Sequence, residues 1–162
     1  MSIEQVIDRW EAAWSSKDPE AFEPVCADRV HYEDPTVAQP LENLEALVAH
    51  AQRLWAAFPD ARLERTGERV FNERYIAAPC KLLGTHRAPL EGLPASNRFL
   101  VVQCVVYAEV EHELLLRARA FFDLYDAATQ LGVLPAHGTL GEKALLMLRG
   151  FGLRGRIAGS GD

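Results

Sequence analysis

The chain has 162 residues, of which 49% are hydrophobic and 25% charged, and its formal net charge is −6. This length and composition are typical of one globular domain and exclude a chain that is disordered throughout. An acidic surface repels phosphate backbones and anionic lipids, so we expect neither nucleic acid nor a membrane as a partner.

The sequence also limits compartment and cofactor chemistry. It contains no long apolar run that could span a membrane, and it begins without the basic and apolar regions of a secretory signal. Three widely spaced cysteines, Cys26, Cys80 and Cys104, suit a reducing cytoplasm. No pair of ligands has zinc spacing, so we expect a cytoplasmic protein with no metal and no cofactor.

Helices are predicted at the start of the chain. Ser2 and Gln5 form a capping box before the apolar positions Ile3, Val6, Ile7, Trp10, Ala13 and Trp14, which recur at helical spacing. Asp18-Pro19 begins a short helix. A longer helix is predicted over residues 43–58, with the apolar stripe Leu44, Leu47, Val48, Ala51, Leu54, Trp55 and Phe58.

Strands are predicted after Pro59, over residues 62–70, 75–85, 99–110 and 114–125, and residues 31–35 form a short extended piece. Helices followed by antiparallel strands indicate an α+β fold. We expect one domain over residues 1–135, a helical extension over 136–154 with a helix at 140–153, and a disordered tail at 155–162.

The sequence of the last two strands predicts the register in which they pair. A three-residue turn at 112–114 places Glu109 opposite Arg117 and Tyr107 opposite Arg119, as an ion pair and a cation–π contact. The opposite face then carries Cys104, Val106, Ala120 and Phe122, all without a carboxyl or imidazole. Between this face and the tryptophans of the first helix we expect either an apolar cavity or a solid core filled by the indoles.

These features resemble a known superfamily. The paired tryptophans, the Glu33-Asp34-Pro35 turn, the long helix and the four strands are similar to the nuclear-transport-factor-2-like cone fold of ketosteroid isomerases and SnoaL-like polyketide cyclases. Residues 84–86, 92–98 and 122–132 resemble the loop and closing signature of the SnoaL-like group. The resemblance implies helices packed on a curved, cone-shaped barrel of strands, with a C-terminal helical extension.

The resemblance also assigns positions. The ketosteroid isomerase base falls on Asp34, and its oxyanion-donating tyrosine falls on Trp10. The acid/base aspartate, histidine and glutamine of the cyclases fall on Ala120, Val106 and Cys104. The predicted back wall therefore carries none of the cyclases' proton-transferring groups, which leaves Asp34 as the catalytic candidate.

Each candidate has a structural alternative. Asp34 is either a base of raised pKa at the cavity mouth or the first residue of an Asx turn. Tyr32 either donates its hydroxyl to a bound oxygen or is a buried structural residue. His86 either orients a substrate oxygen or binds the backbone of its loop. Trp10, Trp14 and Trp55 are core residues of which at least one lines the cavity, and Cys104 is expected to pack rather than react.

We therefore expect a homodimer that binds a small hydrophobic ligand. The leading hypothesis is a cofactor-free isomerase or cyclase that acts on a hydrophobic, polyketide- or steroid-like carbonyl compound through Asp34. The alternatives are a non-catalytic small-molecule-binding module and a module that serves dimerisation alone.

Overall fold

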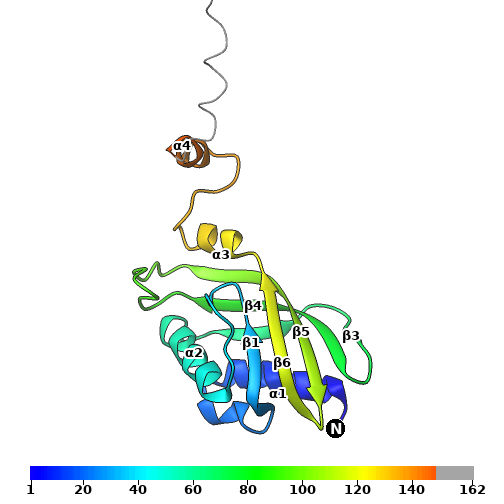
Figure 1. The fold of residues 1–162 in the computed structure, drawn as a ribbon. Helices are drawn as coiled ribbons and strands as arrows, with labels where there is room; N and C mark the ends of the chain where they lie inside the picture. Colours follow the sequence, from blue (N-terminus) through cyan, green and yellow to red (C-terminus); the bar gives the residue numbers. More distant parts are fainter. Residues whose placement is uncertain (149–162) are drawn as a thin grey trace, which may run out of the picture.

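The structure, a computed structural model, describes residues 1–148. In chain order the elements are α1 (Ile3–Ser16), the 3₁₀ helix η1 (Pro19–Phe22), β1 (Cys26–Glu33), α2 (Leu44–Ala57), β2 (Arg62–Arg65), β3 (Val70–Phe71), β4 (Tyr75–Thr85), β5 (Phe99–Glu111), β6 (Leu114–Phe122), α3 (Leu124–Gln130) and α4 (Leu140–Leu148) (Figure 1). The expected helix at 140–153 is therefore described only as far as Leu148, and the tail at 155–162 lies outside the described residues.

One mixed sheet forms the body, in the order β1-β6-β5-β4-β2, with β3 paired to β4. The helices α1 and α2 pack on its concave side, α1 against β2 and β4 and α2 against β1 (Figure 1). This arrangement confirms the α+β cone fold. The prediction of a purely antiparallel sheet is wrong in one place, because β1 runs parallel to β6, with Tyr32 beside Ala118.

The helix starts follow the capping signals of the sequence. The Ser2 hydroxyl accepts a hydrogen bond from the Gln5 backbone while the Gln5 side chain accepts one from the Ser2 backbone. The Asp18 side chain accepts a bond from the Glu20 backbone at the start of η1, and the Asn43 side chain caps α2. These caps satisfy backbone donors that a helix leaves free in its first turn.

The β5–β6 hairpin has the predicted register but a different turn. Tyr107 lies opposite Arg119 and Glu109 opposite Arg117. The turn has two residues, His112 and Glu113, both at positive φ, as in the primed turns that match strand twist. A register shift after Glu109 restores the pairing that a two-residue turn alone would break.

The predicted side-chain contacts across that hairpin are wrong. Glu109 forms its ion pair with Arg74, at 2.6 Å, and not with Arg117. The Arg119 guanidinium lies over the ring of Phe121 and pairs with Glu33, while Tyr107 stacks on Tyr75. Competing partners on neighbouring strands therefore decide these surface contacts.

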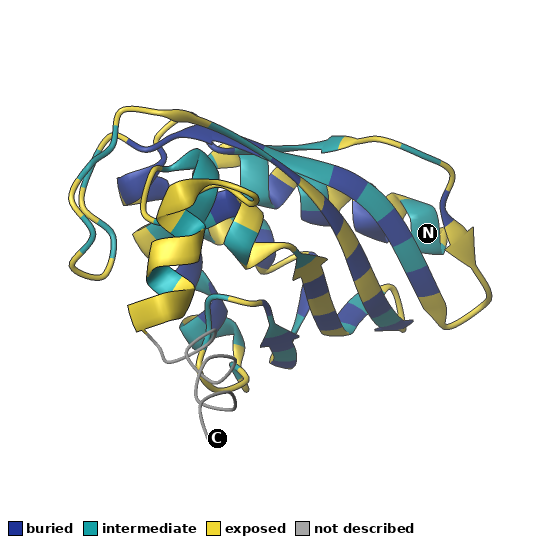
Figure 2. Cartoon of the chain, turned by 90° about the horizontal axis from the view of Figure 1, so that it is seen from above, coloured by how far each residue is buried: buried dark blue, intermediate teal, exposed yellow. Residues whose placement is uncertain are grey.

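Burial alternates along β5 and β6, so that one face of the sheet packs inward and the other is exposed (Figure 2). The inward residues are Val102, Cys104, Val106 and Ala108 of β5 with Leu115, Ala118 and Ala120 of β6. This alternation is the two-residue period of a half-buried sheet.

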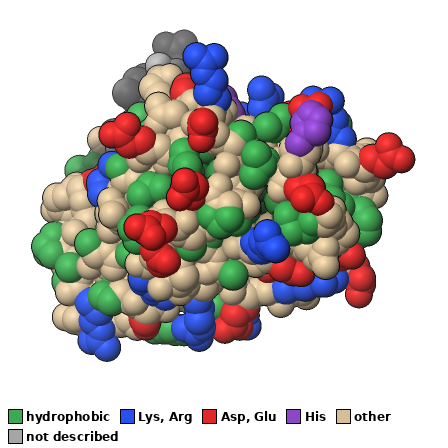
Figure 3. All heavy atoms as spheres, turned by 90° about the horizontal axis from the view of Figure 1, so that it is seen from below, with side chains coloured by type: hydrophobic (Ala, Val, Ile, Leu, Met, Phe, Trp, Pro, Cys, Tyr) green, Lys and Arg blue, Asp and Glu red, His purple; other side chains and the backbone are tan. Residues whose placement is uncertain are grey.

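The surface and the extension add little to the core. Charges of both signs are interspersed over the lower face (Figure 3). The helix α4 has no buried residue and lies beyond α3, away from the sheet (Figure 1). Within residues 1–148, no helix combines the length and the hydropathy needed to cross a bilayer.

Candidate functional site

A cavity of about 440 Å³ lies between the helices and the inward face of the sheet. Its lining is mostly apolar and comes from α1, α2, the inner sheet face and α3. The lining includes nine of the ten candidate site residues named from the sequence, which are Asp34, Trp10, Trp14, Tyr32, Trp55, Cys104, Val106, Ala120 and Phe122.

Asp34 lies just after β1, and its side chain is only 3% exposed. Its Oδ2 accepts hydrogen bonds from the Tyr32 hydroxyl at 2.9 Å and from His50 Nε2 at 2.8 Å. Its Oδ1 accepts bonds from the Thr36 backbone N–H at 2.7 Å and from the Thr36 hydroxyl at 2.6 Å. Asp34 is therefore both the first residue of an Asx turn and a carboxylate that lines the cavity.

The expected rise in the pKa of Asp34 is wrong in direction. Burial by itself raises the pKa of this carboxyl, but the hydrogen bonds from His50 and Thr36 outweigh burial and lower the pKa to about 2. Burial and the neighbouring Asp34 charge raise the pKa of Tyr32 well above its usual value. At neutral pH the site therefore holds an ionised carboxylate beside a neutral phenol.

His50 is a site residue that the sequence reasoning missed. It lies on α2 between Leu47 and Ala51 of the apolar stripe, and its side chain is 5% exposed. The sequence did carry one signal for it: a histidine within an apolar helix stripe is expected to be buried and to need a polar partner. His50 Nδ1 contacts the Arg53 guanidinium at 3.4 Å on the side away from Asp34.

The tryptophans differ in how their indole N–H groups are used. Trp55 Nε1 donates to the Trp14 carbonyl at 2.9 Å. Trp10 is 1% exposed, and its buried Nε1 has no hydrogen-bond partner within the described chain. The Trp10 ring lies 5.8 Å from the Tyr32 ring, measured between centroids. An unpartnered buried donor in a cavity wall is suited to an oxygen acceptor on a ligand.

The back wall of the cavity has the apolar character expected of it. Cys104, Val106 and Ala120 are buried there, and Cys104 pairs in register with Cys80 across β4 and β5. Within residues 1–148, no group of three or more His, Cys, Asp or Glu side chains is arranged to hold a metal ion.

His86 lies outside the cavity lining. It is fully buried, stacks on Phe58 with 5.1 Å between ring centroids, and accepts a hydrogen bond at Nδ1 from the Ser96 backbone at 3.1 Å. The structure therefore places His86 in the support of the 86–98 loop rather than in contact with a ligand.

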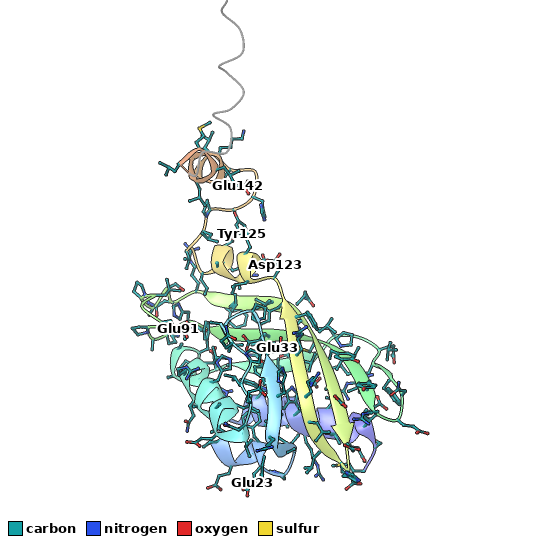
Figure 4. The ribbon with its side chains drawn as sticks, viewed as in Figure 1. Glu23, Glu33, Glu91, Asp123, Tyr125 and Glu142 are labelled. Atoms are coloured by element: carbon teal, nitrogen blue, oxygen red, sulfur yellow. The ribbon has the colours of Figure 1, made fainter. Side chains whose placement is uncertain are left out.

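One end of the cavity is lined by α3 and by the loop that joins β4 to β5. Leu90 and Leu93 pair in a tight turn whose central residues, Glu91 and Gly92, have positive φ, and both leucines line the cavity. Figure 4 shows Glu91 on this loop, at the same end of the molecule as α3.

The Gln130 side chain joins the end of α3 to β5. The Gln130 amide accepts from the Val101 backbone N–H at 3.0 Å and donates to its carbonyl at 2.8 Å. Gln130 therefore occupies both hydrogen-bonding groups of one β5 residue, as a neighbouring strand would.

Comparisons with solved structures agree with this architecture. TsrD from Streptomyces laurentii superposes with a TM-score of 0.72 at 23% identity, covering 82% of this chain and 96% of its own. IdmH from Streptomyces antibioticus gives a TM-score of 0.70 at 22% identity, covering 80% and 98%. A SnoaL-like protein from Jannaschia sp. CCS1 gives 0.72 at 16% identity, covering 82% and 92%. At these identities the likeness shows the fold alone.

The sequence itself carries the family relationship. A comparison with curated proteins found no match. The family model described as SnoaL-like polyketide cyclase matches residues 4–131, which hold all the elements from α1 to α3. The chain therefore belongs to the SnoaL-like polyketide cyclase family.

Proposed function

We propose that this protein is a cofactor-free acid–base enzyme of the isomerase or cyclase type, which acts on a small hydrophobic carbonyl compound. The observation that carries the proposal is the buried Asp34 carboxylate, which four hydrogen bonds hold in the wall of a mostly apolar cavity. A charge with so little solvent is costly unless it is held by donors, and this one is held by Tyr32, His50 and Thr36.

In the proposed reaction Asp34 removes a proton from the carbon next to the carbonyl group. The C–H bond breaks, its electron pair forms an enolate, and the proton passes to Oδ1 as the rotatable Thr36 hydroxyl releases that atom. The enolate oxygen accepts a hydrogen bond from Trp10 Nε1. Return of the proton to another atom gives an isomer. Attack of the enolate carbon on a second carbonyl closes a ring: the new C–C bond forms as the C=O π bond breaks, and the resulting alkoxide takes the proton from Asp34.

The low pKa of Asp34 restricts the substrate. A carboxylate with a pKa of about 2 is ready to accept a proton at neutral pH but is a weak base. The C–H bond that it breaks must therefore be activated by more than one group, such as two carbonyls or a carbonyl and an aromatic ring. The volume of about 440 Å³ suits a compound of a few rings.

The test uses 2-tetralone, whose C1 protons lie between a carbonyl and an aromatic ring. Deuterium incorporation at C1 in D2O is followed by proton NMR. We expect the protein to accelerate exchange, and Asp34→Asn to lower the catalysed rate by about 10²-fold or more, which is the usual loss for a missing base.

The control variant is Asp28→Asn, because Asp28 is an exposed aspartate on β1, the strand that precedes Asp34. We expect it to exchange deuterium like the unchanged protein. Equal rates for Asp34→Asn and the unchanged protein would contradict the proposal. Binding of 2-tetralone with no acceleration would instead favour a non-catalytic binding module.

We also propose that the protein is a homodimer, joined through the outer face of the sheet. That face exposes Val105, Tyr107 and Phe121 on adjacent strands. Two copies placed face to face would remove this apolar surface from water. Sedimentation velocity at micromolar concentration should give a dimer, and Tyr107→Glu should give a monomer; a monomeric unchanged protein would contradict the proposal.

A further inference from the structure

His50 contacts the candidate base from behind the cavity wall. It is absent from the cavity lining, whereas Asp34 and Tyr32 belong to it. Among the residues that the structure describes, its ring hydrogen-bonds only to Asp34 on one side and to Arg53 on the other. A ligand in the cavity therefore reaches the carboxylate without touching the imidazole.

The contacts of the two His50 ring nitrogens require the same tautomer. A guanidinium can only donate, so the 3.4 Å contact with Arg53 makes Nδ1 the acceptor nitrogen. A carboxylate can only accept, so the 2.8 Å contact with Asp34 requires the proton to be on Nε2.

We propose that His50 is the positioning residue of this site: its Nε2–H aims the Asp34 carboxylate into the cavity and keeps it charged there. The part of this inference that concerns catalysis rests on the proposed function. Tyr32 and Thr36 come from the same strand and turn as Asp34, so they move with it. His50 comes from α2, and it therefore ties the carboxylate to a separate rigid element.

The other groups beside this pair do not substitute for His50. The Tyr32 phenol from β1 and the Cys104 thiol from β5 lie close enough to influence, or be influenced by, the Asp34 charge. The α1 residue in contact with His50 is Trp14, which does not titrate. Burial and the Asp34 charge raise the pKa of the Tyr32 phenol, so Tyr32 does not change charge in acid.

Two variants separate positioning from packing. His50→Gln keeps a side-chain N–H that reaches toward Asp34 but removes the ring. His50→Leu keeps apolar bulk and removes the donor. The Thr36 backbone N–H, which donates to Asp34 Oδ1, reports the ionisation of the carboxylate through its NMR shift. This readout does not depend on any catalytic activity.

We expect the Thr36 amide of the unchanged protein and of His50→Gln to show no transition until the pH approaches 2–3, in keeping with the pKa of about 2 for Asp34. In His50→Leu the midpoint should rise by about one pH unit or more, because burial is then opposed by fewer donors. Exchange of 2-tetralone by His50→Leu should gain an acidic limb at the same pH, with the larger loss in kcat rather than KM. A residue that only packs would lower rates equally at all pH values.

The inference is overturned if Thr36 in folded His50→Leu has the same midpoint as in the unchanged protein, or if His50→Gln behaves like His50→Leu. Should His50→Leu not fold, the imidazole of the unchanged protein decides the matter: long-range proton–nitrogen NMR at neutral pH must show the Nε2–H tautomer, and an Nδ1–H tautomer refutes the inference. A protein that exchanges no 2-tetralone but shows the expected Thr36 shifts removes the proposed function and leaves the positioning role of His50 standing.

Discussion

The Tyr32 hydroxyl donates a hydrogen bond to Asp34 Oδ2 at 2.9 Å. Tyr32 therefore presents an oxygen acceptor to the cavity and has no second proton to offer a carbonyl. Trp10, whose Nε1–H has no partner within the described chain, is the better donor for a ligand oxygen. The two residues divide the polar part of the cavity into an acceptor and a donor.

Replacing Trp10 by Phe should test this division. The ring is kept while the N–H is lost, so we expect 2-tetralone exchange to slow by about 10²-fold, as for the removal of one donor to a developing oxyanion. Trp55→Phe is the matched control, because the Trp55 N–H is already bonded to the Trp14 carbonyl. A loss of rate in the control equal to that in Trp10→Phe would argue against Trp10 as the donor.

The low pKa of Asp34 should make stability depend on pH in acid. The pKa falls from 3.8 to about 2 on folding, so the carboxylate stabilises the fold above about pH 4, and this stabilisation is lost as the pH falls toward 2. The shift corresponds to about 2 kcal/mol. Urea unfolding should show Asp34→Asn less stable at neutral pH, with the difference narrowing below pH 4 and no such trend for Asp28→Asn.

Filling the cavity from the back wall should abolish ligand binding and preserve the fold. Ala120 is buried and lines the cavity, and its inward direction leaves room for a larger group. Ala120→Leu should prevent saturation-transfer NMR signals from 2-tetralone with an unchanged circular dichroism spectrum. Phe121→Leu, on the outer face of the same strand, is the control and should bind normally. Undiminished binding by Ala120→Leu would show that the ligand lies elsewhere.

Two arginine pairs should differ in their effect on stability. The Arg69 side chain is 1% exposed and contacts Asp8 at 2.7 Å and Glu11 at 3.0 Å, so Arg69→Met should lower the free energy of unfolding by about 3 kcal/mol. Arg74 is half exposed beside Glu109, and Arg74→Met should cost much less, because solvent screens an exposed ion pair. Chemical denaturation of both variants measures the difference, and equal losses would contradict it.

Local signals in the sequence were enough for most of the fold. The predicted strand at residues 75–85 matches β4 at both ends, since its apolar run is bounded by turn residues. The predicted strand at 62–70 is wrong in extent: only residues 62–65 and 70–71 pair, because Gly67 and neighbouring charged residues interrupt it. The sequence predicts β1 only from residue 31. Its parallel partner β6 lies about ninety residues later, and no local sequence pattern indicates a pairing over that distance.

The site was harder to predict than the fold. The sequence shows that Asp34 follows a strand and precedes a proline, but it cannot show that His50 from another helix reaches the same carboxylate. The hydrogen bonds from His50 and Thr36 together reverse the expected direction of the pKa shift of Asp34. Likewise His86 has the residue type and loop position expected of a ligand contact. In the folded chain its ring stacks on Phe58 and accepts a hydrogen bond from the Ser96 backbone.

The parallel pairing of β1 with β6 has a consequence for biosynthesis. Cys26 lies beside Leu115, so β1 cannot gain its partner in the sheet until the ribosome has released nearly the whole domain. Until then β1 has only the isolated bridge between Tyr32 and Leu41, while α1 and α2 form from local contacts. Sheet completion is therefore a late event in folding, and until it occurs the edge of β1 is open to aggregation.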